Sequence, residues 1–227
     1  MAEEDQENLA IEAVRERIEA GEYLDSMPGV PGEDFEGGGA FRYAPDGQLA
    51  RVHARWEPGF RAAREAGRIP SLPPLEPATV DAIEACEAAI GRPLPRLLRR
   101  CYLELGDGGF GPANGLVPVA ELAPSFLDQR WPAGFPDEAR NLLTICHWGC
   151  GITSFIDLGD PAGSMWGMDP NPAPEEEIAA SLFRQDMTLA SWLLRWTESR
   201  LYPPWLFEDP NTGRWHGGTD ADWEGPE

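Results

Sequence analysis

Apolar residues recur with a helical period in several segments of the chain. In residues 3–20, Ile11, Val14 and Ile18 share one face while Glu and Arg fill the other, which predicts an amphipathic helix. Residues 79–90 and 94–105 repeat the pattern on either side of a Gly-Arg-Pro-Leu-Pro break, which favours two short helices. We expect their core faces to be Val80, Ile83 and Ile90 in the first, and Leu94, Leu97, Leu98, Cys101, Tyr102 and Leu105 in the second.

Apolar and β-prone runs predict a set of strands further along the chain. Residues 142–147, 152–158 and 164–168 are joined by short turns that contain glycine, which is typical of an antiparallel meander. A further strand is expected at residues 115–119. Residues 181–199 then favour a helix that begins after Thr188, a suitable N-cap residue.

A β-hairpin is predicted nearer the N-terminus. Residues 40–44 and 49–56 flank a Pro-Asp-Gly turn, in which Gly supplies the positive φ that such turns need. Arg51, His53 and Arg55 alternate along the second strand. We interpret them as its solvated face, and binding of a phosphate or an acidic partner is the alternative.

Charge is distributed unevenly along the 227 residues. The net charge is −21, and every one of the 18 basic residues is arginine. Residues 1–40 hold twelve carboxylates and two arginines, whereas residues 41–167 hold fifteen and twelve. Such a balance repels nucleic acid and favours a basic partner, although acidic ends that only solvate the chain are the simpler interpretation. A hydrophobic content of 42% with nine Trp indicates a folded core.

The residues that could carry chemistry do not assemble into a familiar site. Cys146, His147 and Cys150 are too few for structural zinc, and adjacent strand residues point to opposite faces. Three His and no Gly-x-Ser-x-Gly turn give no catalytic triad, so we expect no enzyme, no metal and no cofactor. The acidic N-terminus and the lack of an apolar run of about 18 residues predict a cytoplasmic protein that does not bind membranes.

One stretch resembles a known family. Glu84, the Ile-Gly-Arg-Pro-Leu-Pro run at residues 90–95, Tyr102 and the Gly-Asp-Gly-Gly-Phe run at residues 106–110 are similar to the start of the SUKH (SMI/KNR-like) superfamily. Three later features are similar to the middle of that family: the Gly149-Cys150-Gly151 turn, Asp157 and Trp166.

The resemblance implies a fold and indicates which residues belong to it. It implies an α+β fold, with a mixed or antiparallel sheet packed against N-terminal and C-terminal helices. It covers residues 70–200. We therefore expect residues 1–69 to form an acidic extension with an extra helix and hairpin, and residues 201–227 to form an acidic tail rich in aromatic residues, which packs back on the domain or holds a partner.

The resemblance also implies a function. Bacterial members act as immunity proteins that bind a cognate toxin, often a nuclease, so the expected partner is a basic protein toxin blocked by steric and electrostatic occlusion. The candidate contact residues are Asp107, Phe110, Trp166 and Asp169, although core positions for Phe110 and Trp166 are the favoured interpretation. Two alternatives are an intracellular scaffold or regulatory module of the same family and an enzyme that uses His147 with a cysteine.

Overall fold

The computed structural model describes residues 3–30, 41–43, 49–55, 57–219 and 222. Its helices are α1 (Glu3–Glu19), α2 (Phe60–Glu65), α3 (Val80–Ile90), α4 (Arg96–Glu104), α5 (Val119–Asp128) and α6 (Leu189–Thr197), with 3-10 segments η1 (Asp137–Asn141) and η2 (Glu175–Ser181). Its strands are β1 (Ser26–Pro28), β2 (Phe41–Tyr43), β3 (Leu49–Ala54), β4 (Leu142–Gly149), β5 (Ile152–Asp157), β6 (Ser164–Met168), β7 (Leu182–Thr188), β8 (Leu206–Glu208) and β9 (Trp215–Gly217). The α+β class predicted from the sequence is confirmed.

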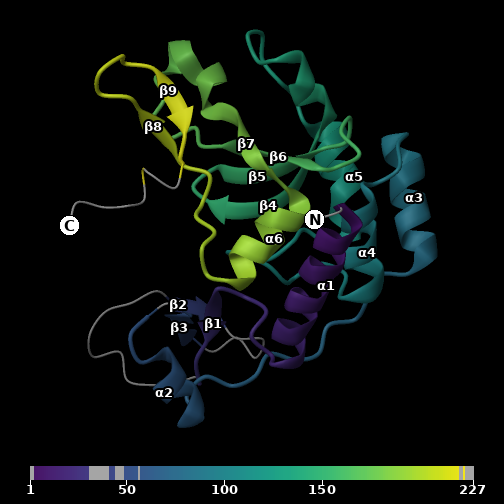
Figure 1. Ribbon diagram of the computed structural model, residues 1–227, viewed down its shortest axis with the longest axis vertical. Helices are drawn as coiled ribbons and strands as arrows, with labels where there is room; N and C mark the ends of the chain where they lie inside the picture. Colours follow the sequence, from purple (N-terminus) through teal and green to yellow (C-terminus); the bar gives the residue numbers. More distant parts are fainter. Residues whose placement is uncertain (1–2, 31–40, 44–48, 56, 220–221, 223–227) are drawn as a thin grey trace.

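The main sheet is antiparallel, with strand order β4-β5-β6-β7 (Figure 1). Successive residues of a strand point to opposite faces, so the sheet contributes to two cores. Ile156 and Met165 pair in register and lie in the main core with the helices, whereas their neighbours Phe155 and Trp166 lie in a smaller core on the other face. Trp131 and Phe135 pack against that smaller core.

The strand expected at residues 115–119 is not formed. Leu116 makes a single isolated bridge to Cys146, at a register shift in β4 that places both Ile145 and Cys146 in the main core. Pro118 has no N–H to continue a ladder, and α5 begins directly after it. The prediction was therefore wrong because the chain turns into a helix as soon as it reaches the sheet.

Helix α1 belongs to the main core although it lies before the predicted boundary at residue 70. Ala10, Ile11 and Val14 are buried in the same cluster as the helices and strands that follow, and α1 lies beside α6 in Figure 1. By contrast, the three-stranded sheet β1-β3-β2 and α2 have a cluster of their own around Met27 and Ile69.

The core faces predicted for the two central helices are largely confirmed. All six residues expected on the second face are buried, because α4 has one apolar stripe at helical spacing. In α3, Ile83 and Ile90 are buried as expected, but Val80 is 49% exposed at the first helical position. Thr79 caps α3 through the Ala82 N–H, and Gly91 ends it with a φ of 79°.

The predicted solvated face of β3 is corrected at its middle residue. His53 is only 6% exposed because it pairs in register with Met27 of β1, and the side chains of directly opposed residues lie on the same face of a sheet, where Met27 is buried. Arg51 and Arg55 are half-buried. Residue 56, the last of the predicted strand, lies outside the described residues.

The C-terminal segment packs back on the domain. Strands β8 and β9 form a hairpin beside β7 (Figure 1). The side chain of Asp169 holds this hairpin, because its Oδ2 accepts the Leu206 N–H at 3.1 Å. Strand β7 itself was not predicted, since its central residues Arg184, Gln185 and Asp186 are polar, as is typical of a strand at the edge of its sheet.

Candidate functional site

The four residues chosen from the sequence do not gather at one surface. Phe110 is 0% exposed in the main core, and Trp166 is 9% exposed in the core on the opposite face of the sheet. Asp169 is 5% exposed and accepts hydrogen bonds from Asn171 and Leu206. The side chains of Phe110, Trp166 and Asp169 are therefore buried within the domain.

Asp107 is the member of that set with an exposed side chain. Its Oδ1 accepts the Val119 N–H at 2.8 Å, and Val119 is the first residue of α5. A carboxylate at this place satisfies a free N–H of the helix and interacts favourably with its dipole. Asp107 thus orders the start of α5 and remains accessible to solvent.

The cysteine and histidine group is not brought together either. Cys146 lies in the main core, where burial raises the pKa of its thiol well above the ordinary value, whereas Cys150 is exposed at the β4–β5 turn with a φ of 50°. Among the described residues, no group of three or more His, Cys, Asp or Glu is placed to hold a metal ion.

A groove lined by aromatic side chains lies where four segments of the chain meet. Its volume is about 680 Å³, and it is formed by the segment that leads into β1, the loop before α5, the end of β4 and the segment after α6. The side chains that shape it are Asp25, Ala113, Trp148, Leu201, Tyr202 and Trp205. We call it the aromatic groove.

The segment after α6 cannot continue the helix, and this places its aromatic residues at the groove. Ser199 has a φ of 59°, and Pro203-Pro204 follows shortly after. Tyr202 is 41% exposed and Trp205 is 40% exposed, so both rings present apolar surface to solvent. Trp148 is held in place from the sheet, because its Nε1 donates to Ser154 Oγ at 2.9 Å.

Asp25 places a carboxylate against this apolar surface. Its Oδ1 accepts the Trp196 indole N–H at 2.8 Å, and its Oδ2 accepts the Ala113 N–H at 3.2 Å. Burial raises the pKa of Asp25, and these two hydrogen bonds only partly oppose that effect. Among the described residues no Arg or His forms an ion pair with Asp25, so the partners seen for its carboxylate are these two neutral donors.

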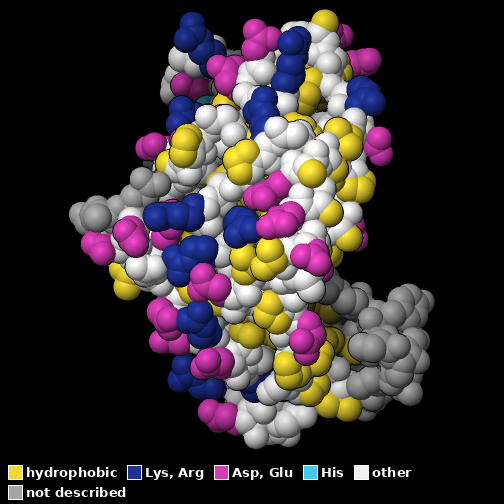
Figure 2. Space-filling model, turned by 90° about the vertical axis from the view of Figure 1, so that its right-hand side faces the viewer, with side chains coloured by type: hydrophobic (Ala, Val, Ile, Leu, Met, Phe, Trp, Pro, Cys, Tyr) yellow, Lys and Arg dark blue, Asp and Glu magenta, His cyan; other side chains and the backbone are white. Residues whose placement is uncertain are grey.

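The helical face of the molecule has a different character. Figure 2 shows arginines and carboxylates interspersed on it, with no large area of one sign. Several of them form ion pairs, including Arg96 with Glu7 at 2.9 Å and Arg100 with Glu104 at 2.7 Å. This face resembles an ordinary solvated surface, which leaves the aromatic groove as the stronger candidate for binding a protein.

Comparisons with protein-family models, with curated proteins and with solved structures found no match for the chain. None of the helices in the described part of the chain has the length and apolar character needed to cross a bilayer.

The sequence indicates part of the aromatic groove but not all of it. The aromatic content after residue 200 had suggested contact with the domain or a partner, and Trp205 lies at the groove. Asp25 and Trp148 were missed. Asp25 stands before a turn-rich segment with no motif around it, and its partners Ala113 and Trp196 are brought to it only by the tertiary fold.

Proposed function

We propose that this protein is an immunity protein of the SUKH type, which binds a basic protein toxin and blocks it by occlusion. The observation that carries the proposal is the aromatic groove, with exposed Tyr202 and Trp205 rings beside the Asp25 carboxylate. Trp and Tyr supply much of the binding energy at protein interfaces, since they bury a large area at a small cost in side-chain entropy.

A basic partner suits the charge of both the groove and the chain. A Lys or Arg side chain that enters the groove would neutralise Asp25 while its aliphatic part contacts the rings. The net charge of −21 would raise the rate of encounter with a basic toxin, more than it would raise the final affinity. Occlusion requires no chemistry from the immunity protein, in keeping with the proposal that it is not an enzyme.

The first test is co-expression of the full chain with toxin genes adjacent to its own gene. Rescue of growth by the wild type supports the function, and failure with every adjacent toxin would count against it. Binding of the purified toxin should weaken by roughly tenfold or more in Trp205→Ala and in Tyr202→Ala, as expected for central aromatic residues. Leu127→Ala is a matched control, because Leu127 is 51% exposed on α5 and lies outside the groove.

A comparison of the variants tests which surface of the protein contacts the toxin. Rescue that survives both aromatic substitutions but fails in Asp107→Arg would place the interface at the start of α5, provided that this variant unfolds in urea at the same midpoint as the wild type. Rescue unaffected by all three substitutions would exclude both surfaces.

A further inference from the structure

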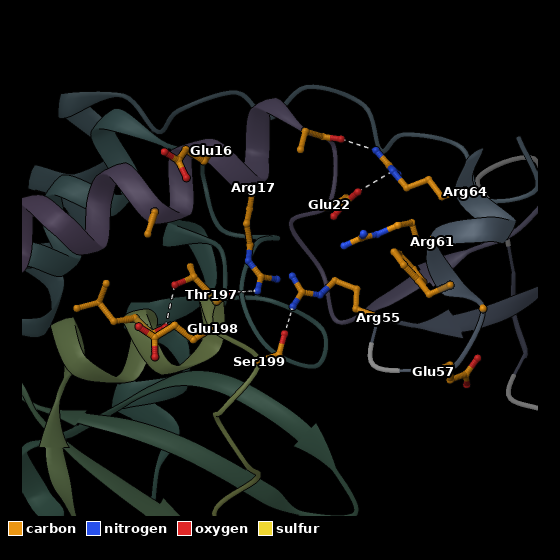
Figure 3. Close-up of a pocket in the computed structure, with 15 residues that line it drawn as sticks. Glu16, Arg17, Glu22, Arg55, Glu57, Arg61, Arg64, Thr197, Glu198 and Ser199 are labelled. Carbon is orange, nitrogen blue, oxygen red and sulfur yellow. Dashed lines mark hydrogen bonds and ion pairs between the residues drawn. The ribbon is translucent and has the colours of Figure 1, made fainter. Parts of the chain in front are cut away.

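A second hollow, whose lining shares Ser199 with the aromatic groove, contains four arginines (Figure 3). Its volume is about 800 Å³, and it lies between the C-terminal half of α1, the end of α6, and the segment from Arg55 through α2. Arg17 comes from α1, Arg55 follows β3, and Arg61 and Arg64 lie on α2. We call this hollow the arginine pocket.

Two of the guanidinium groups are fixed by contacts with the end of α6. Arg17 lies over the Trp196 ring at 4.6 Å from its centroid, and its Nη2 donates to the carbonyl oxygens of Trp196, at 3.0 Å, and Thr197. The Nη2 of Arg55 donates to Ser199 Oγ. Figure 3 shows these two groups next to each other, with the side chain of Arg61 directed towards them.

Four glutamates, Glu16, Glu22, Glu57 and Glu198, line the same pocket, but among the described residues only Glu22 pairs with one of its arginines. Arg64 forms an ion pair with Glu22, with Nε and Oε1 2.7 Å apart. No such pair within 4.0 Å is formed by Arg17, Arg55 or Arg61 with any carboxylate of the described residues. This is unexpected in a chain with 39 acidic residues.

Helix capping explains only part of the arrangement. Arg17 and Arg64 donate to carbonyl oxygens near the ends of α6 and α1, which is an ordinary structural role for a cation. Arg55 has no such role. Burial lowers its pKa to about 10, and its Nε is buried without a hydrogen-bond partner in the described structure, as is Nη1 of Arg17. Partly buried cations that lie next to one another lower the stability of the fold unless an anion binds between them.

We propose that the arginine pocket binds a phosphate-bearing small molecule, whose phosphate groups lie between Arg17, Arg55 and Arg61. Guanidinium groups form paired, charge-assisted hydrogen bonds with phosphate oxygens, and a doubly charged phosphate can neutralise several cations at once. The volume is within the range of pockets for ligands of nucleotide size.

The rest of the lining fits the remainder of such a ligand. Glu16 and Glu57 also line the pocket, and their carboxylates would accept hydrogen bonds from hydroxyl groups of a sugar. Phe60 adds an apolar side chain on the α2 side. The two linings share Ser199, but none of the pocket's arginines lines the aromatic groove, and the test of the arginine pocket requires no toxin.

The test is calorimetric titration of the purified full chain at low ionic strength with two probes, inorganic pyrophosphate and ADP. We expect saturable binding that weakens as salt rises. Binding should fall by roughly tenfold or more in Arg61→Gln, since each charge-assisted hydrogen bond contributes on that order. Arg61 is exposed and has no partner in the described structure, so this substitution should leave folding intact.

A control variant distinguishes binding in the arginine pocket from nonspecific attraction of phosphate to arginines elsewhere on the surface. Arg140→Gln should bind both probes as the wild type does, because the Arg140 side chain is 80% exposed and lies outside the pocket. Equal affinity for pyrophosphate and ADP would show that the pocket contacts only the phosphate groups. Tighter binding of ADP would show that it also contacts the nucleoside. Both outcomes support the site. Absence of saturable binding of either probe, or equal losses in Arg61→Gln and Arg140→Gln, would overturn it.

Discussion

Asp25 joins the N-terminal region to the end of the domain, and its removal should destabilise the whole fold. Its carboxylate accepts hydrogen bonds from the Trp196 indole, at 2.8 Å, and the Ala113 amide, at 3.2 Å. Asp25→Ala leaves both donors without a partner, and each buried orphan costs about 1–3 kcal/mol. Relief from burying a charge offsets part of this, so we expect the free energy of unfolding to fall by about 2–4 kcal/mol.

Asp25→Asn is the finer perturbation. Its amide oxygen can accept from one donor while its NH2 group faces the other, so a smaller loss of about 1–2 kcal/mol is expected. Burial raises the pKa of Asp25 above 3.8, which means that the folded state holds the proton more tightly than the unfolded state. The stability advantage of the wild type over Asp25→Asn should therefore shrink as pH rises from 3.8 through the raised pKa, and then level off.

Urea unfolding followed by Trp fluorescence, at several pH values between about 4 and 8, measures both effects. Asp186→Asn is the matched control, because Asp186 is an exposed carboxylate on β7. The reasoning is refuted if Asp25→Ala loses no more stability than the control, or if the advantage over Asp25→Asn grows with pH.

Three further predictions follow from buried groups and close contacts. Tyr102→Phe should lower the free energy of unfolding by about 1 kcal/mol in urea titration, since the buried Tyr102 hydroxyl donates to Val117 O at 2.6 Å. Gly217→Ala should speed hydrogen exchange of the β8 amides, because a Cβ there would lie 2.1 Å from the Phe183 ring; unchanged exchange would contradict this docking. Titration with a thiol reagent at pH 8 should find Cys150 reactive in the native state and three more thiols only after denaturation, since burial raises the pKa of Cys86, Cys101 and Cys146.

The helices were predictable because their signals are local. The apolar stripes of α1 and α4 follow the helical period, and the Thr188 cap is formed as expected, with Ser191 completing a capping box. Segment 115–119 has an apolar, strand-like composition, yet Asp107 and Pro118 together start a helix there. That outcome depends on a contact between residues 12 positions apart, which a pattern over a few residues does not contain.

The candidate sites depend on contacts over much longer separations. Asp25 meets Trp196 across 171 positions, and Arg55 meets Ser199 across 144. Neither residue belongs to a motif, and the alternation along residues 49–56 had placed Arg55 on a solvated face. In the folded chain Arg55 lies beside the end of α6, where burial removes the solvent that would otherwise stabilise its positive charge.

The packing of α1 against α6 has a consequence for synthesis of the chain. About 170 residues separate the end of α1 from the start of α6, and ribosomes add about 5–20 residues each second. The apolar face around Ile11 and Val14 therefore waits about 10–35 s for its final partner to be translated. During that interval the apolar stripe of α1 lacks its contact with α6, and a ribosome that stalls before residue 189 leaves that contact unformed.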